Sequence, residues 1–209
     1  MTLSPKSPVA VAPIDASPFP LSLSLVKQHL REDSDDFDEI IELYMRAAVA
    51  WAEGAMKRTI YSRAHTWILA DFPRDLIGEI RLPAGFCTSV ESIVYVDVDG
   101  APQTLTGPSS SSPGGDDWQE SLTGDAGGLL QPSGPGGWPV VNVYTPAPVT
   151  ISFTAGWASP DVPADITHAL LFAVADMYDT AGSADLTVFG KNLTTRNMLI
   201  SPYILNRWY

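Results

Sequence analysis

The feature that most constrains the fold is a long helical pattern that gives way abruptly to strand patterns. The carboxylates of Asp35, Asp36, Asp38 and Glu39 precede it, where the positive end of a helix dipole favours negative charge. Behind them apolar residues recur at three- and four-residue spacing, which predicts a helix over about 35–58 and a shorter one before it, starting at Ser22–Ser24 and ending near residue 30. The recurring residues are Phe37, Ile40, Ile41, Tyr44, Ala47, Ala48, Trp51, Ala55 and Met56.

From Ser62 onward the apolar period changes to two, which is typical of strands with one buried face. Asp99-Gly100 separates two of these runs and is a strong hairpin-turn signal. We therefore expect an antiparallel sheet. Its predicted strands are 62–70, 79–82, 90–98, 102–106, 140–144 and 149–154.

A third helix is predicted near 163–180. Pro163 suits a helix start, Asp161 or Asp165 can serve the N-terminus, and Gly182 would end the helix. Its apolar stripe is Ile166, Leu170, Leu171, Val174, Met177 and Tyr178. The fold class is therefore α+β: a small helical bundle, made of two N-terminal helices plus this third one, with an antiparallel β-sheet and an extended C-terminal tail.

Three segments stand outside this plan. Residues 1–21 mix Pro, Ser, Ala and Val, a composition typical of a flexible arm. The main folded domain, 22–185, contains an insertion at 107–137 that is dominated by Gly, Ser and Pro and is predicted to be too polar to pack by itself. Residues 186–209 form a tail too apolar to stay in water, so it either completes the chain's own core or anchors in a partner's pocket.

Charge and composition narrow the classes of partner. A formal net charge of −12 repels phosphates, so free nucleic acid is a poor candidate ligand. The single cysteine, Cys87, excludes an internal disulfide and a multi-cysteine zinc site, and it fits a reducing cytoplasm. No apolar run reaches the roughly 18 residues that span a bilayer, and no signal peptide is evident, so we expect neither a membrane partner nor export.

Searches for catalytic and metal-binding patterns give no candidate site. His29, His65 and His168 lack HxxxH or HExxH spacing, and Cys87 has no accompanying His or Asn pattern. The Asp-x-Asp-Gly sequence 97–100 could begin a calcium loop but is more simply a turn, and glycines 114–137 lack the lysine of a phosphate-binding loop. We expect a non-enzymatic protein with no catalytic, cofactor-binding or metal-binding residues and no cofactor.

Five stretches carry a family resemblance and cover most of the chain outside the arm and the insertion. They are LVKQHLRED…DDFDEIIELYMRAAVAWAEGAMKRTI at 25–60, TWILADFP at 66–73, EIRLPAGFCTSVESIVYVDVDGAPQTL at 79–105, VTISFTAGWA…VPADITHALLFAVADMYD at 149–179 and VFGKNLTTRNMLISPY at 188–203. Together they resemble the head–tail connector (adaptor) family of long-tailed phages, which also occurs in prophages and gene transfer agents.

The resemblance implies a structural protein of a virion or virus-like particle, made in the bacterial cytoplasm. Such adaptors form a homo-oligomeric ring, most often of twelve subunits, between the portal protein and a stopper or other tail-side neck protein. DNA would pass through the ring's channel without specific binding. The alternatives are another neck component, such as a stopper or tail-terminator ring, and, from other classes, a small hydrolase or a carbohydrate-binding module.

The apolar, aromatic tail has the composition of an anchor, which suggests that it docks into the portal. The arm and the insertion depart from the family pattern, so the resemblance implies nothing about them. The hypothetical portal-docking residues are Leu199, Ile200, Tyr203, Ile204, Leu205, Arg207, Trp208 and Tyr209.

Overall fold

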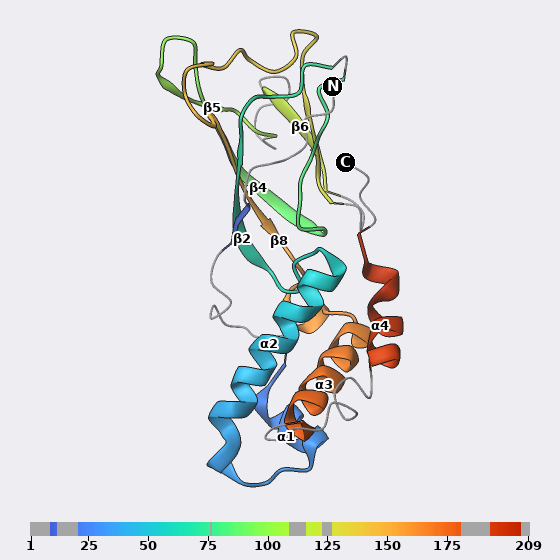
Figure 1. Cartoon of the computed structure of the whole chain (residues 1–209). Helices are drawn as coiled ribbons and strands as arrows, with labels where there is room; N and C mark the ends of the chain where they lie inside the picture. The colour runs from blue at the N-terminus through green and yellow to red at the C-terminus, as the bar shows by residue number, and fades with distance from the viewer. Residues whose placement is uncertain are drawn as a thin grey trace. The chain divides into compact units, whose positions relative to one another are not determined.

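The chain forms two compact units, which we call the helical unit and the β unit (Figure 1). The helical unit lies within 14–61 and 157–206, and the β unit consists mainly of 62–156. The predicted domain boundaries, with an arm at 1–21, a domain at 22–185 and a tail at 186–209, stay a prediction. The computed structural model describes residues 9–11, 21–75, 77–108, 116–122, 127–180 and 193–205.

The first helices of the helical unit lie where the sequence predicts them. Helix α1 spans Leu23–Leu30, and the Ser22 hydroxyl caps it by accepting a hydrogen bond from the Leu25 amide at 3.2 Å. A 3₁₀ turn, η1 (Asp35–Phe37), leads into α2 (Asp38–Met56). Both helices end in a left-handed residue, Arg31 after α1 and Lys57 after α2, whose backbone amide bonds back to the last turn.

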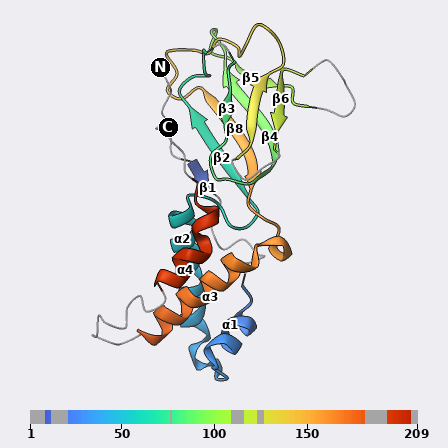
Figure 2. The same cartoon turned by 90° about the vertical axis from the view of Figure 1, so that its right-hand side faces the viewer.

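After the β unit, the chain returns to the helical unit through η2 (Ser159–Asp161) and α3 (Ala164–Asp179). Pro163 precedes α3 as its N-cap, and Asp165 lies in the first turn. Helix α3 packs against both α2 and α4, as Figures 1 and 2 show. Gly182, the predicted helix end, lies outside the described residues.

The described part of the C-terminal segment differs from the extended tail predicted from the sequence. It forms helix α4 (Leu193–Ile200) and the 3₁₀ turn η3 (Ser201–Tyr203). Ile200 and Leu205 are buried in the helical unit, and the Leu205 amide donates to the Met56 carbonyl at 3.0 Å. The apolar residues of this segment therefore support local helix packing, which a weakly amphipathic sequence did not reveal.

The β unit contains two antiparallel sheets. The first has the order β1-β2-β8-β4-β5 and the second the order β3-β7-β6. Their bounds are β1 (Val9–Val11), β2 (Arg63–Leu69), β3 (Ile80–Arg81), β4 (Cys87–Val96), β5 (Pro102–Leu105), β6 (Trp118–Ser121), β7 (Leu129–Pro132) and β8 (Val149–Ala155).

Strand β8 shows how the sequence directs the first sheet. Every second side chain of the strand is buried, while the intervening ones are partly exposed. Residues of both sheets and of the connecting loops complete one shared core, including Trp67, Phe72, Trp118 and Leu130. Strand β1 lies inside the arm predicted at 1–21 and pairs with the edge of β2.

The described parts of segment 107–137 pack together with the rest of the β unit rather than by themselves. Those parts supply β6 and β7, whose residues Trp118 and Leu130 are fully or almost fully buried. Gly107 shows why one glycine of this Gly-rich segment is needed, because a Cβ at this position would lie 2.6 Å from the Trp118 ring. The buried side chains of Trp118 and Leu130 thus pack this segment into the core, although its average composition is that of a loop.

The predicted strand 140–144 is also wrong, because the structure has an irregular loop there. Asn142 holds the loop: its amide donates to the Val96 carbonyl at 2.9 Å, and its side-chain oxygen accepts from the Tyr144 amide at 2.9 Å. Pro139, Pro146 and Pro148 flank the run and have no amide to donate to a ladder. In this run Val141 is buried in the core, whereas Val140, Val143 and Tyr144 are exposed.

Candidate functional site

Two of the three histidines contact one phenylalanine ring in the helical unit, and the third lies in the β unit. His29 on α1 and His168 on α3 both pack against the ring of Phe172, at centroid distances of 6.1 and 4.5 Å. His65 is buried in the β unit and stacks on Phe153 at 5.1 Å. Across the described ranges, no three His, Cys, Asp or Glu side chains come together as a metal-binding group.

The Asp-x-Asp-Gly sequence forms a turn, as the sequence favoured. One carboxylate oxygen of Asp97 accepts hydrogen bonds from the amides of Asp99 and Ala101, at 3.0 and 2.9 Å. The other oxygen accepts from the Gln103 side chain at 2.7 Å, and this bond is the main reason that the pKa of Asp97 is lowered. The carboxylate therefore supports the hairpin that joins β4 to β5.

Cys87 lies in the core of the β unit and is 1% exposed. Its thiol donates to the Gly85 carbonyl at 3.4 Å. A substrate could not reach this sulfur without opening the core, so the structure gives it a packing role.

The acidic run 32–39 ties the helices together. Lys27 on α1 reaches Asp35 at 2.6 Å and Asp38 at 2.8 Å, and these bonds raise the pKa of its ammonium group. The Tyr178 hydroxyl on α3 donates to Glu32 at 2.7 Å, which, with the Ser34 amide, lowers the pKa of that carboxyl group. Part of this run thus connects α1, α2 and α3.

Helix α2 carries an exposed apolar row opposite its buried face. The buried face is Ile41, Met45, Ala48, Val49, Ala52 and Met56. The exposed row alternates spacings of three and four residues, and its large members come first in the helix. We call this row the α2 stripe: Ile40, Leu43, Ala47, Ala50 and Gly54.

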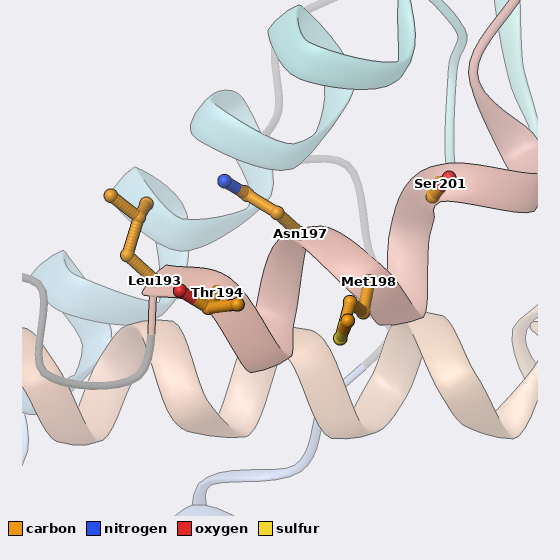
Figure 3. Close-up of a pocket in the computed structure, with 5 residues that line it drawn as sticks. All are labelled: Leu193, Thr194, Asn197, Met198 and Ser201. Atoms are coloured by element: carbon orange, nitrogen blue, oxygen red, sulfur yellow. The ribbon is translucent and has the colours of Figure 1, made fainter.

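Helix α4 carries a second exposed surface that has no charged residue. It is a shallow depression, which we call the α4 face: Leu193, Thr194, Asn197, Met198 and Ser201. Figure 3 shows these side chains along α4 and at the start of η3. Met198 is 71% exposed, and only Arg196 and Ile200 of this helix are buried.

Exposed apolar residues also gather in loops of the β unit. Val98 lies in the β4–β5 turn, and Val140, Val143 and Tyr144 lie in the loop before β8, where Tyr144 is 93% exposed. The Asn142–Val96 hydrogen bond brings this loop to the end of β4. Sequence reasoning missed this surface because it assigned 140–144 to a strand, and the flanking prolines were the available signal.

The structure separates the hypothetical docking residues into three groups. Ile200 and Leu205 are buried and serve the chain's own helical unit. Leu199, Tyr203 and Ile204 are partly exposed, and the Tyr203 ring meets the Trp157 ring edge-on at 6.2 Å. Arg207, Trp208 and Tyr209 lie outside the described residues, so portal docking stays a prediction for this segment.

None of the helices in the described residues is both long and apolar enough to cross a bilayer.

The sequence pattern does not distinguish the α2 stripe from the buried face of α2, since Ile40 and Ala47 are next to the buried Ile41 and Ala48 in the sequence. Periodicity finds an amphipathic helix, but a helix with two apolar sides needs the structure to show which side is buried.

Comparisons with known proteins place the fold. No family model matches the chain, and neither does any curated protein. The chain is similar to one in the neck of an empty GTA particle computed with C6 symmetry, with TM-score 0.74, 20% identity and coverage of 96% of this chain and 97% of that one.

Two further solved structures agree. A chain of the virion of a native gene transfer agent (GTA) particle gives TM-score 0.70 at 22% identity, covering 95% of this chain and 97% of that one. A chain of the neck of a native GTA particle computed with C12 symmetry gives TM-score 0.64 at 20% identity, covering 96% and 97%. The chain therefore has the α+β fold of chains in gene transfer agent necks, and its resemblance to head–tail connectors is confirmed at the level of the fold.

Proposed function

We propose that this chain is a structural, non-enzymatic protein of the neck of a gene transfer agent or phage-like particle. The observation that carries the proposal is the agreement in fold over almost the full length of both chains, with neck structures computed with C6 and C12 symmetry. Within the neck, we assign the chain the adaptor role: a ring of twelve copies between the portal protein and the tail-side neck protein.

The charge of the chain suits this role. Twelve copies with a net charge of −12 each would give a strongly acidic ring around a channel. Repulsion between carboxylates and DNA phosphates lets DNA pass without being held, which matches passage without specific binding. The exposed carboxylates of Asp33, Asp36 and Glu39 are available for such a surface.

The nearest alternative is another ring-forming neck component, such as a stopper or a tail terminator. Those components tend toward all-β barrels, whereas this chain has a helical unit with α1, α2, α3 and α4. The helical unit therefore favours the adaptor role. A hydrolase would need a convergent polar constellation, which the sequence does not indicate, and the amphipathic helices have no place in a carbohydrate-binding module.

Negative-stain microscopy of the purified chain, alone and mixed with the portal ring of the same particle, tests the proposal. The expected result is a ring of this chain capping the portal. A version ending at Leu205 should bind the portal more weakly if Arg207, Trp208 and Tyr209 dock there, and it keeps α4 and the buried Leu205 intact. No association of the full chain at micromolar concentration would overturn the adaptor role.

A further inference from the structure

The α2 stripe and the α4 face belong to two different helices of the helical unit, and α3 packs against both helices. In Figure 1, α2 lies at the left of this unit and α4 at the right, with α3 between them. The stripe is the side of α2 that points away from its buried residues. The α4 face likewise excludes the two buried residues of that helix, Arg196 and Ile200.

The spacing of the α2 stripe is suited to packing against another helix. Steps of three and four residues keep a row of side chains on one side of a helix over several turns, as in helix pairs that cross at a shallow angle. Ile40 and Leu43 supply bulk at one end of the row, and Ala47, Ala50 and Gly54 leave a notch at the other. A Cβ added at Gly54 would meet nothing within 4 Å, so the notch is open.

The α4 face offers a complementary shape. Met198 is its most exposed apolar side chain, and methionine is flexible enough to fill an irregular notch. Thr194, Asn197 and Ser201 surround it with small, uncharged polar groups. The exposed, flexible Met198 side chain is thus suited to contact the small residues of the notch.

The charge of the chain favours a second copy contacting these two uncharged surfaces. Copies that each carry a net charge of −12 repel one another, so their contact surfaces need to be free of carboxylates. The five residues of the α2 stripe and the five of the α4 face include no charged side chain. Because the two surfaces differ, a contact between them is head-to-tail, the kind of contact that closes into a ring.

We propose that the α2 stripe of one copy packs on the α4 face of the next copy, with Met198 seated in the notch over Ala47, Ala50 and Gly54. This inference rests on the proposed ring-forming function and names the subunit contact that forms the ring. Each copy supplies one stripe and one face, so every subunit in a closed ring makes the same two contacts.

Disulfide trapping tests the contact directly. The double variant Ala50→Cys with Met198→Cys should form covalent ladders on non-reducing gels when the chain is assembled, alone or on the portal ring, and the ladders should collapse on reduction. Each single variant should stop at dimers or monomers, since the only natural cysteine, Cys87, is buried. The matched control is Glu42→Cys with Met198→Cys, because Glu42 is exposed on α2 but lies off the stripe.

A charge substitution gives an independent measurement. Ala50→Glu places a carboxylate in the notch at an exposed position, so the fold should tolerate it, and ring assembly should need at least about tenfold more protein, which corresponds to about 1.4 kcal/mol per contact. Ala50→Ser should assemble like the natural chain. Circular dichroism would confirm that both variants are folded.

The outcomes separate this inference from the proposed function. Rings seen by microscopy without ladders in the double variant, and with normal assembly of Ala50→Glu, would overturn the contact and leave the neck function intact. Absence of rings for the natural chain, with and without the portal ring, would overturn both. Ladders equal in the control pair would show that trapping is non-specific and would count against the contact.

Discussion

The guanidinium group of Arg196 on α4 donates a hydrogen bond to the carboxylate of Asp176 on α3 at 3.0 Å, and both side chains are buried. The same guanidinium lies over the Trp51 ring of α2, 4.6 Å from its centroid. One cation thus joins three helices. The α4 face is held in place by a contact on the opposite side of its own helix, so this ion pair supports the proposed subunit surface.

We predict that Asp176→Ala lowers the free energy of unfolding by roughly 3–5 kcal/mol, because it leaves the buried Arg196 charge without its carboxylate partner. Chemical denaturation followed by tryptophan fluorescence measures this change. The matched control is Glu42→Ala, which removes an exposed pair with Arg46 at 3.8 Å and should change the free energy by less than about 1 kcal/mol. Equal effects of the two substitutions would contradict the role of the buried pair.

Buried His65 should make the β unit sensitive to mild acid. Burial, together with the nearby charge of Arg63, lowers the pKa of His65 from 6.5 to about 4. Between pH 4 and pH 6.5, His65 is therefore protonated in the unfolded chain but not in the folded chain. The free energy of unfolding is highest above pH 6.5 and falls as the pH drops toward 4. The loss amounts to up to roughly 3 kcal/mol.

The check is the free energy of unfolding measured at several pH values. His65→Phe keeps a ring against Phe153 but cannot titrate, so its difference from the natural chain should depend on pH across this window. A difference between His65→Phe and the natural chain that stays constant from pH 4 to 7 would refute the prediction.

Tyr178→Phe should raise the pKa of Glu32. The hydroxyl of Tyr178 is the main group that lowers this pKa from 4.5, and the Ser34 amide contributes next. Since the folded pKa lies below the unfolded one, the bond stabilises the helices above pH 4.5 and is lost as the pH falls through the folded pKa. Carboxyl NMR titration measures the shift, and Tyr44→Phe on α2 serves as the control. An unchanged Glu32 titration in Tyr178→Phe would show that the bond does not form in solution.

Trp118→Ala should destabilise the β unit by about 3–5 kcal/mol, the usual cost of removing a large buried aromatic side chain. Its neighbour Gln119 is exposed on the same strand, so Gln119→Ala should change the free energy of unfolding by less than about 0.5 kcal/mol. Thermal unfolding of the two variants compares them. If Trp118→Ala were as stable as the natural chain, β6 would not be part of the core.

The elements predicted well are those whose sequence pattern is local. Strand β8 is recognisable within one window because its period of two matches the face that becomes buried, and helix α2 is recognisable from its helical period, although the predicted apolar set includes the exposed Ile40 and Ala47. Strand β6 was not predicted because burial of its Trp118 ring depends on close contact with Gly107, and the local sequence pattern does not show this contact. Helix α4 was not predicted because its Arg196 packs against Asp176 and Trp51, which are distant in the sequence.

The candidate surfaces were less predictable than the fold. Exposure is a property of the packed chain, and Ile40 and Ile41 are adjacent apolar residues with opposite environments. The hypothesis of a tail anchor was reasonable from composition, yet the structure assigns Ile200 and Leu205 to the core of the helical unit. The packing of the core determines which apolar residues stay exposed and can contact a partner.

The central claim, that the chain forms a ring in the neck, is tested most directly by counting its copies on the portal. Native mass spectrometry of the portal ring mixed with excess chain gives this count. The account predicts a discrete complex with twelve added copies, the number set by the C12 symmetry of the similar neck. A portal mass that does not change, or a broad distribution of one to a few added copies, would contradict it.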